Sequence, residues 1–178
     1  MSDDLFNRAI RVVLRHEGVY SDDPNDPGGA TKYGISLRYL RSLGMHTGDI
    51  DQDGDIDEDD IRKLSLDQAI AIYKEQWWDR YGYHRLPEAL AVKVFDLAVN
   101  VGPTTAHRML QRALVACGKP VAVDGVLGPQ TVRAAQEVDP EACLREIRTE
   151  AVMHYLLLAR ARPQLERYLL GWLRRAVA

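Results

Sequence analysis

Two residues near the start of the chain, Glu17 and Asp26, have types and positions suited to acid catalysis. Glu17 follows Phe6, Ile10 and Val13 at helical spacing, so a helix through these residues places its carboxyl group on the apolar face. Burial there disfavours the charged form of a carboxyl group, and a general acid must be protonated before it reacts. If the helix ends earlier, Glu17 is instead a solvated side chain.

Asp26 comes nine residues after Glu17, and Thr31 comes five residues after Asp26. Residues 31 to 35 alternate in the way that is typical of a short hairpin. Glycoside hydrolysis needs one carboxylic acid and a second polar group that acts as nucleophile or positions water. Glu17, Asp26 and Thr31 are therefore candidate catalytic residues, although Asp26 before Pro27 can also be a simple turn residue.

An acidic segment from residue 49 to residue 60 matches the twelve-residue calcium loop, with its regular oxygen ligands and its glycine at the sixth place. Asp60 stands where the usual ligand is Glu, and its shorter side chain predicts monodentate binding. A solvated linker is the alternative, but eight acidic residues without a base would repel one another. We predict a structural calcium ion and no catalytic cofactor. The expected ligands are the carboxylates of Asp49, Asp51, Asp53 and Asp60, the carbonyl of Asp55, and Asp57 through a water molecule.

The composition fits one folded domain of 178 residues, with 46% hydrophobic and 28% charged residues. No apolar run is long enough to cross a membrane, and the acidic start of the chain is unlike a signal peptide. Two cysteines, Cys117 and Cys143, fit free thiols in a reducing compartment. Outside the acidic segment the chain is mildly basic, which suits an anionic polymer such as nucleic acid or cell wall.

Capping residues and helix breakers predict a mainly helical chain. Ser2 is a candidate N-cap for a helix reaching Glu17, and Ser65 with Gln68 forms a capping box for a helix reaching Trp78. Further helices are expected near 36–43, 88–101, 104–117, 129–138, 140–161 and 163–176.

Several segments resemble the signature of glycoside hydrolase family 108, namely HEGVYSDDP at 16–24, DPGGATKYGI at 26–35, DLAVNVGP at 96–103, DGVLGPQT at 124–131 and GWLRR at 171–175. Family members are muramidases, and many are carried by phages. The resemblance implies that Glu17 is the catalytic acid. Val19 departs from the usual glycine of that motif.

The resemblance also implies a lysozyme-like fold, mainly α with a small β-hairpin next to the catalytic helix, into which the calcium loop is inserted. We expect a single domain over residues 1–178, with a catalytic lobe at 1–100 that includes loop 49–60, and a helical lobe at 101–178 that resembles a peptidoglycan-binding region. Tyr33 and Asn100 are expected to contact sugar, although Asn100 can also be an ordinary residue near a helix end. Asp22 or Asp23 can replace Asp26 as the partner of Glu17.

The implied activity is hydrolysis of the β-1,4 bond between N-acetylmuramic acid and N-acetylglucosamine, with inversion by analogy with phage-type lysozymes. The expected protein is a monomeric phage or prophage endolysin, held in the host cytoplasm until a holin releases it to the periplasm. Its expected partner is peptidoglycan, with no nucleic acid and no stable membrane insertion. The alternatives are a noncatalytic wall-binding protein and a calcium-dependent secretion helper.

Overall fold

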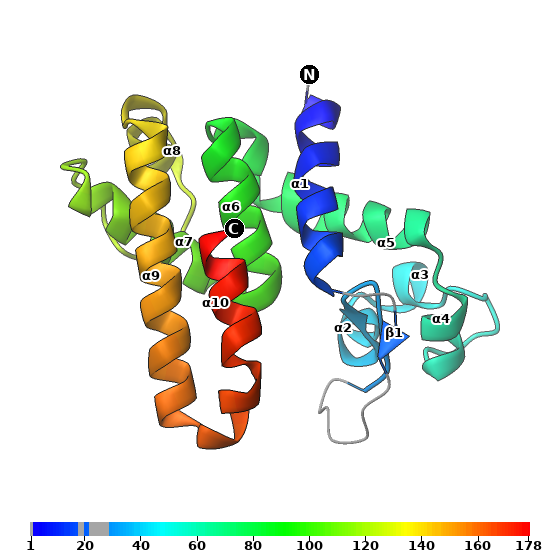
Figure 1. Ribbon diagram of the computed structural model, residues 1–178. Helices are drawn as coiled ribbons and strands as arrows, with labels where there is room; N and C mark the ends of the chain where they lie inside the picture. The colour runs from blue at the N-terminus through cyan, green and yellow to red at the C-terminus, as the bar shows by residue number, and fades with distance from the viewer. Residues whose placement is uncertain (1, 18–19, 22–28) are drawn as a thin grey trace. The chain divides into compact units, whose positions relative to one another are not determined.

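A computed structural model of the chain describes residues 2–17, 20–21 and 29–178 (Figure 1). These residues form two compact units, one from Ile10–Glu75 and a larger one from Met1–Ala9 and Gln76–Ala178. The smaller unit holds the strands β1 (Tyr20–Ser21), β2 (Thr31–Lys32) and β3 (Ile35–Ser36), with the helices α2 (Leu37–Ser42), α3 (Met45–Gly48), α4 (Glu58–Lys63) and α5 (Leu66–Tyr73).

The predicted hairpin is confirmed, because β2 and β3 pair antiparallel with Lys32 opposite Ile35. Tyr33 and Gly34 form its two-residue turn, and both have positive φ values, 52° and 82°. A two-residue turn with two positive φ angles matches the twist of the strands that it joins. A third strand, β1, pairs with the other side of β2 and was not predicted.

Helix α1 (Ser2–Glu17) confirms the helix predicted at the start of the chain. Phe6, Ile10 and Val13 are buried on its inner face, as the spacing predicted. Glu17 is the last residue of the helix and is half-buried. The helix therefore continues to Glu17 and does not leave it in a solvated loop.

Two helix caps follow one another at and just after the C-terminal end of the acidic segment. The predicted capping box of Ser65 and Gln68 opens α5, with both of its hydrogen bonds present. A second capping box, which was not predicted, joins Asp57 to Asp60 at the start of α4. Helix α5 continues into a π-helix, η1 (Lys74–Asp79), and this passes into the larger unit.

The larger unit is a helical bundle around α6 (Glu88–Val101), whose inner residues are almost completely buried. Helices α7 (Pro103–Ala116) and α9 (Pro140–Ala161) pack against α6 and against each other. The 3-10 turn η2 (Tyr83–Arg85) precedes α6, and α8 (Pro129–Glu137) follows α7. Helix α10 (Leu169–Val177) lies beside α9, to which η3 (Pro163–Tyr168) connects it (Figure 1). The segment predicted as a helix from 163 thus begins as a 3-10 helix.

Arg175 of the C-terminal helix is buried, although it is charged. Its guanidinium group is buried and donates to the Asp96 carboxylate across 3.1 Å, joining α10 to α6. Lys93, on the same face of α6, donates to the backbone carbonyl of Arg175, and burial lowers the pKa of Lys93 to about 8.

Among the described helices, none has the length and apolar character needed to span a membrane.

Candidate active site

The side chain of Glu17 lies against the turn of the hairpin. A Cβ atom placed on Gly34 would lie 2.7 Å from Glu17 Cγ and 2.4 Å from the hydroxyl oxygen of Tyr73. Both distances are shorter than nonbonded carbon and oxygen atoms tolerate, so a side chain at this position would displace Glu17 or Tyr73. The backbone of Gly34 therefore forms the surface on which the aliphatic part of Glu17 rests.

Tyr73 connects this surface to helix α5. Its hydroxyl group donates a hydrogen bond to the backbone carbonyl of Tyr33 at 3.0 Å, and its side chain is fully buried. The sequence analysis missed Tyr73, because an aromatic residue on the apolar face of a helix is usually an ordinary core residue. Its position forty residues after Tyr33 carries no local signal.

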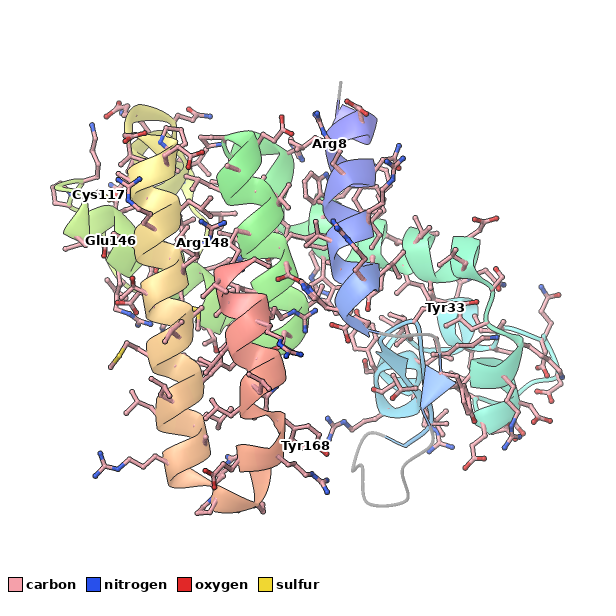
Figure 2. The ribbon with its side chains drawn as sticks, in the orientation of Figure 1. Arg8, Tyr33, Cys117, Glu146, Arg148 and Tyr168 are labelled. Carbon is pink, nitrogen blue, oxygen red and sulfur yellow. The ribbon has the colours of Figure 1, made fainter. Side chains whose placement is uncertain are left out.

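Two predicted site residues lie beside the turn. Thr31 is half-buried on β2, and its hydroxyl group donates to the carbonyl of Gly29 at 3.3 Å. The Tyr33 side chain, labelled in Figure 2, is half-buried, and the ammonium group of Lys32 lies 5.6 Å from its ring centre. Asp26 and its alternatives, Asp22 and Asp23, lie outside the described residues.

The smaller unit thus brings a carboxylic acid, a hydroxyl group and an aromatic ring to one hairpin. Glu17 comes from the end of a helix and lies against Gly34 of the turn, whereas Thr31 and Tyr33 come from the strand and turn of the same hairpin. The aliphatic part of Glu17 packs on Gly34, and Tyr73 holds the same turn through its hydrogen bond to Tyr33. Such a site can donate a proton to the leaving oxygen of a bound sugar.

Asn100 belongs to the larger unit, near the end of α6. Its side chain is exposed, and its Oδ1 atom accepts a hydrogen bond from the Tyr155 hydroxyl group at 2.8 Å. This bond fixes the orientation of the Asn100 amide through its oxygen. Its NH2 group can then donate a hydrogen bond to a hydroxylated ligand.

The acidic segment contains two groups of carboxylates that could hold a cation. In each group, one oxygen of every residue lies within 4.8 Å of the others. The groups are Asp49, Asp51 and Asp53, and Asp55, Asp57 and Asp60. Repulsion from the Asp53 carboxylate raises the pKa of Asp55, whereas a hydrogen bond from Lys63 lowers the pKa of Asp51.

The segment 124–131 forms a turn that buried polar side chains hold in place. Gln111 of α7 accepts a hydrogen bond from Gly125 N at 2.8 Å and donates to the Asp124 carboxylate at 2.8 Å. His107 is buried between the Gly125 carbonyl and the Tyr83 hydroxyl group, at 3.0 and 2.9 Å. The turn ends at Pro129, the first residue of α8, so its motif has a structural role in joining α7 to α8.

Comparison with known families gives two matches that together cover most of the chain. Residues 10–102 match the family model described as Glycosyl hydrolase 108. Residues 105–177 match the model described as Predicted Peptidoglycan domain. No curated protein matches the sequence significantly.

Among solved structures, SagA from Brucella abortus is similar to this chain, with a TM-score of 0.77 and 26% sequence identity. The match covers 98% of this chain and 91% of the SagA chain. The similarity therefore extends over both compact units and includes the region that carries Glu17.

Proposed function

Because the chain belongs to glycosyl hydrolase family 108, we propose that it is an N-acetylmuramidase that hydrolyses the β-1,4 bond between N-acetylmuramic acid and N-acetylglucosamine. The fold is mainly α and lysozyme-like, with a small antiparallel sheet. The family match and the predicted peptidoglycan domain make the protein a glycoside hydrolase with peptidoglycan as its partner.

The observation that supports the proposal is the position of Glu17 at the end of α1, with its side chain resting on Gly34 of the hairpin. In the proposed reaction, Glu17 protonates the oxygen of the leaving sugar. Asp26, with the hydroxyl group of Thr31, positions the attacking water. Tyr33 contacts the sugar from the turn.

Substitution of Glu17 by Gln tests the central assignment, because it keeps the shape of the side chain and removes the acid. On purified Gram-negative peptidoglycan we expect at least about a hundredfold loss of product release, the scale of general acid catalysis. Glu75→Gln is a matched control, because Glu75 lies in the same unit and is exposed. Equal activity of Glu17→Gln and the unsubstituted protein would remove Glu17 from the mechanism.

The chemical nature of the products tests the bond that is cleaved. A muramidase leaves N-acetylmuramic acid at the new reducing end, which borohydride reduction and mass spectrometry of the fragments identify. N-acetylglucosamine at the reducing end would indicate a glucosaminidase. A fragment that cannot be reduced would indicate that water is not the acceptor. Either result would contradict the proposal while leaving the family assignment intact.

Three carboxylates compete for the role of partner to Glu17, and single substitutions separate them. We expect Asp26→Asn to abolish activity and both Asp22→Asn and Asp23→Asn to retain it. The stereochemistry follows from the same role, because a water positioned by Asp26 attacks from the face opposite the leaving group and inverts the anomeric centre. Proton NMR of freshly released product reports the anomer, and retention would exclude this role for Asp26.

We extend the proposal to an endolysin that a holin releases from the cytoplasm into the periplasm. The resemblance of the motifs around Glu17 to those of phage-borne muramidases supports this extension. Expression of the chain in a Gram-negative host should cause lysis only when a holin is expressed with it. Lysis by the chain alone would contradict holin dependence. A binding assay of inactive Glu17→Gln on sacculi distinguishes the alternatives. Binding indicates a wall-binding enzyme, and no binding indicates a secretion helper.

A further inference from the structure

One carboxylate oxygen in the acidic segment is buried without a hydrogen bond. The side chain of Asp51 is 9% exposed, and its Oδ2 atom pairs with the ammonium group of Lys63. Its Oδ1 atom is buried and has no hydrogen-bond partner among the residues that the structure describes. Burial of a carboxylate oxygen without a partner costs free energy, so a bound cation would stabilise the folded loop.

The neighbours of Asp51 provide further oxygen ligands. Carboxylate oxygens of Asp49, Asp51 and Asp53 lie within 4.8 Å of one another. Asp49 accepts hydrogen bonds from the backbone nitrogens of Asp53 and Gly54, which holds the loop around this group. The backbone turns at Gln52 and Gly54, where φ is 63° and 101°. A cation bound at this group would have Asp51 as a ligand, and the Oδ1 atom of Asp51 is the oxygen that lacks a partner.

Asp60 closes the loop and can offer only one further bond. Its Oδ1 atom accepts from the backbone nitrogens of Ile50 and Asp51, and its Oδ2 atom accepts from that of Asp57. A carboxylate has about four lone-pair sites, so three are already occupied. Asp60 is therefore limited to a single metal bond unless the loop rearranges.

We propose that the loop from Asp49 to Asp60 binds one calcium ion, which is coordinated by Asp49, Asp51, Asp53 and one oxygen of Asp60. The carbonyl of Asp55 and a water molecule held by Asp57 complete a set of six oxygens. Calcium accepts six to eight oxygen ligands in an adaptable geometry. Magnesium requires near-ideal octahedral geometry, so this loop suits it less well than calcium. Segment 49–60 contains no His or Cys, which disfavours zinc and copper.

Hydrogen bonds connect the loop and helix α4 to the elements of the candidate active site. Lys32 of β2 donates from its ammonium group to the carbonyl of Arg62 in α4. Arg41 of α2 donates to the carbonyl of Ile56 at 2.8 Å, and Ile61 of α4 is completely buried. An ion that orders the loop thus also orders α4, on which β2 rests. The role of the ion is structural, and it does not depend on the reaction proposed for Glu17.

Calcium titration of the full, chelator-treated protein tests the site without reference to lytic activity. Calorimetry should show one ion per chain with a dissociation constant on the order of 10⁻⁵ to 10⁻⁴ M, weaker than in loops with a bidentate Glu. A saturating calcium concentration should raise Tm by about 3 °C or more. No binding heat together with an unchanged Tm, two ions per chain, or equal affinity for magnesium would overturn the assignment.

Two single substitutions distinguish a defined site from a diffuse ionic atmosphere. Asp51→Asn should weaken calcium binding at least tenfold. Asp59→Asn removes the same charge from the same segment at a position that is not a ligand, where Asp59 pairs with Arg62, and it should retain the affinity within a few fold. If Asp51→Asn does not fold, the exposed Asp53→Asn replaces it. Equal weakening by the ligand variant and Asp59→Asn would overturn the proposal.

Discussion

The hydroxyl group of Tyr73 donates a hydrogen bond to the backbone carbonyl of Tyr33, at 3.0 Å. This bond ties helix α5 to the turn of the hairpin, and the next residue in that turn, Gly34, supports the side chain of Glu17. The position of the proposed acid relative to Thr31 and Tyr33 therefore depends on a buried tyrosine that itself has no proposed chemical role.

Tyr73→Phe is expected to lower the free energy of unfolding by about 1–2 kcal/mol, because the carbonyl of Tyr33 loses a buried donor. We also expect a several-fold fall in kcat with a smaller change in KM, since the hairpin moves relative to Glu17. Urea unfolding and steady-state hydrolysis of peptidoglycan measure the two effects. Tyr81→Phe is the matched control, and unchanged stability and kcat in Tyr73→Phe would contradict the positioning role.

Gly34→Ala is expected to reduce activity at least about tenfold, because the added methyl group displaces Glu17 or Tyr73. Gly44→Ala provides a matched control for backbone strain, since its φ of 76° is close to the 82° of Gly34 and no atom lies within 4 Å of the added Cβ. Both variants should lose about 1 kcal/mol of stability from the positive φ angle. Hydrolysis assays on both proteins distinguish the effect of backbone strain, which the two variants share, from the effect of the steric clash, which only Gly34→Ala has. A similar loss of activity in both would argue against the contact.

Asn100→Ala is expected to raise KM for peptidoglycan about tenfold with little change in kcat, as for the loss of a binding contact. Tyr155→Phe removes the hydrogen bond that orients Asn100 and keeps the Asn100 side chain, so it should reduce stability and have a smaller effect on KM. Kinetics and thermal melting of the two variants test this difference. An unchanged KM in Asn100→Ala would exclude Asn100 from sugar binding.

The lowered pKa of Lys93 predicts that the free energy of unfolding depends on pH above about pH 8. Burial lowers its pKa from 10.5 to about 8, opposed by Asp96 and assisted by Arg148 and Arg175. Between these two pH values the unfolded chain binds more protons at Lys93 than the folded chain does, so the contribution of Lys93 to stability rises with pH. Below pH 8 the cost of burying the charged form is fully present.

The comparison of the unsubstituted protein with Lys93→Met isolates this contribution, because titrating groups distant from Lys93 affect both proteins equally. The free energy of unfolding of the unsubstituted protein should increase relative to Lys93→Met between pH 8 and pH 10.5. Denaturant unfolding at several pH values measures the difference. A difference that stays constant over this range would show that Lys93 titrates normally in the folded protein.

Much of the local structure followed from the sequence, because its causes lie within a few residues of one another. The spacing of Phe6, Ile10 and Val13 predicted the buried face of α1, and the pair Ser65 and Gln68 predicted the start of α5. The alternation of residues 31 to 35 predicted the hairpin, but not the position of its turn at Tyr33 and Gly34. The motif around Glu17 and the regular acidic residues of segment 49–60 were also legible in the sequence, as hypotheses about chemistry.

Other features were decided only by tertiary packing. The contact of Tyr73 with Tyr33 joins residues forty positions apart, and the ion pair of Asp96 with Arg175 joins residues seventy-nine positions apart. No periodicity or capping rule specifies such partners, because they depend on how completed helices and strands pack. The sequence by itself determined which residues are able to donate a proton or bind calcium. Packing decided that Gly34 supports Glu17.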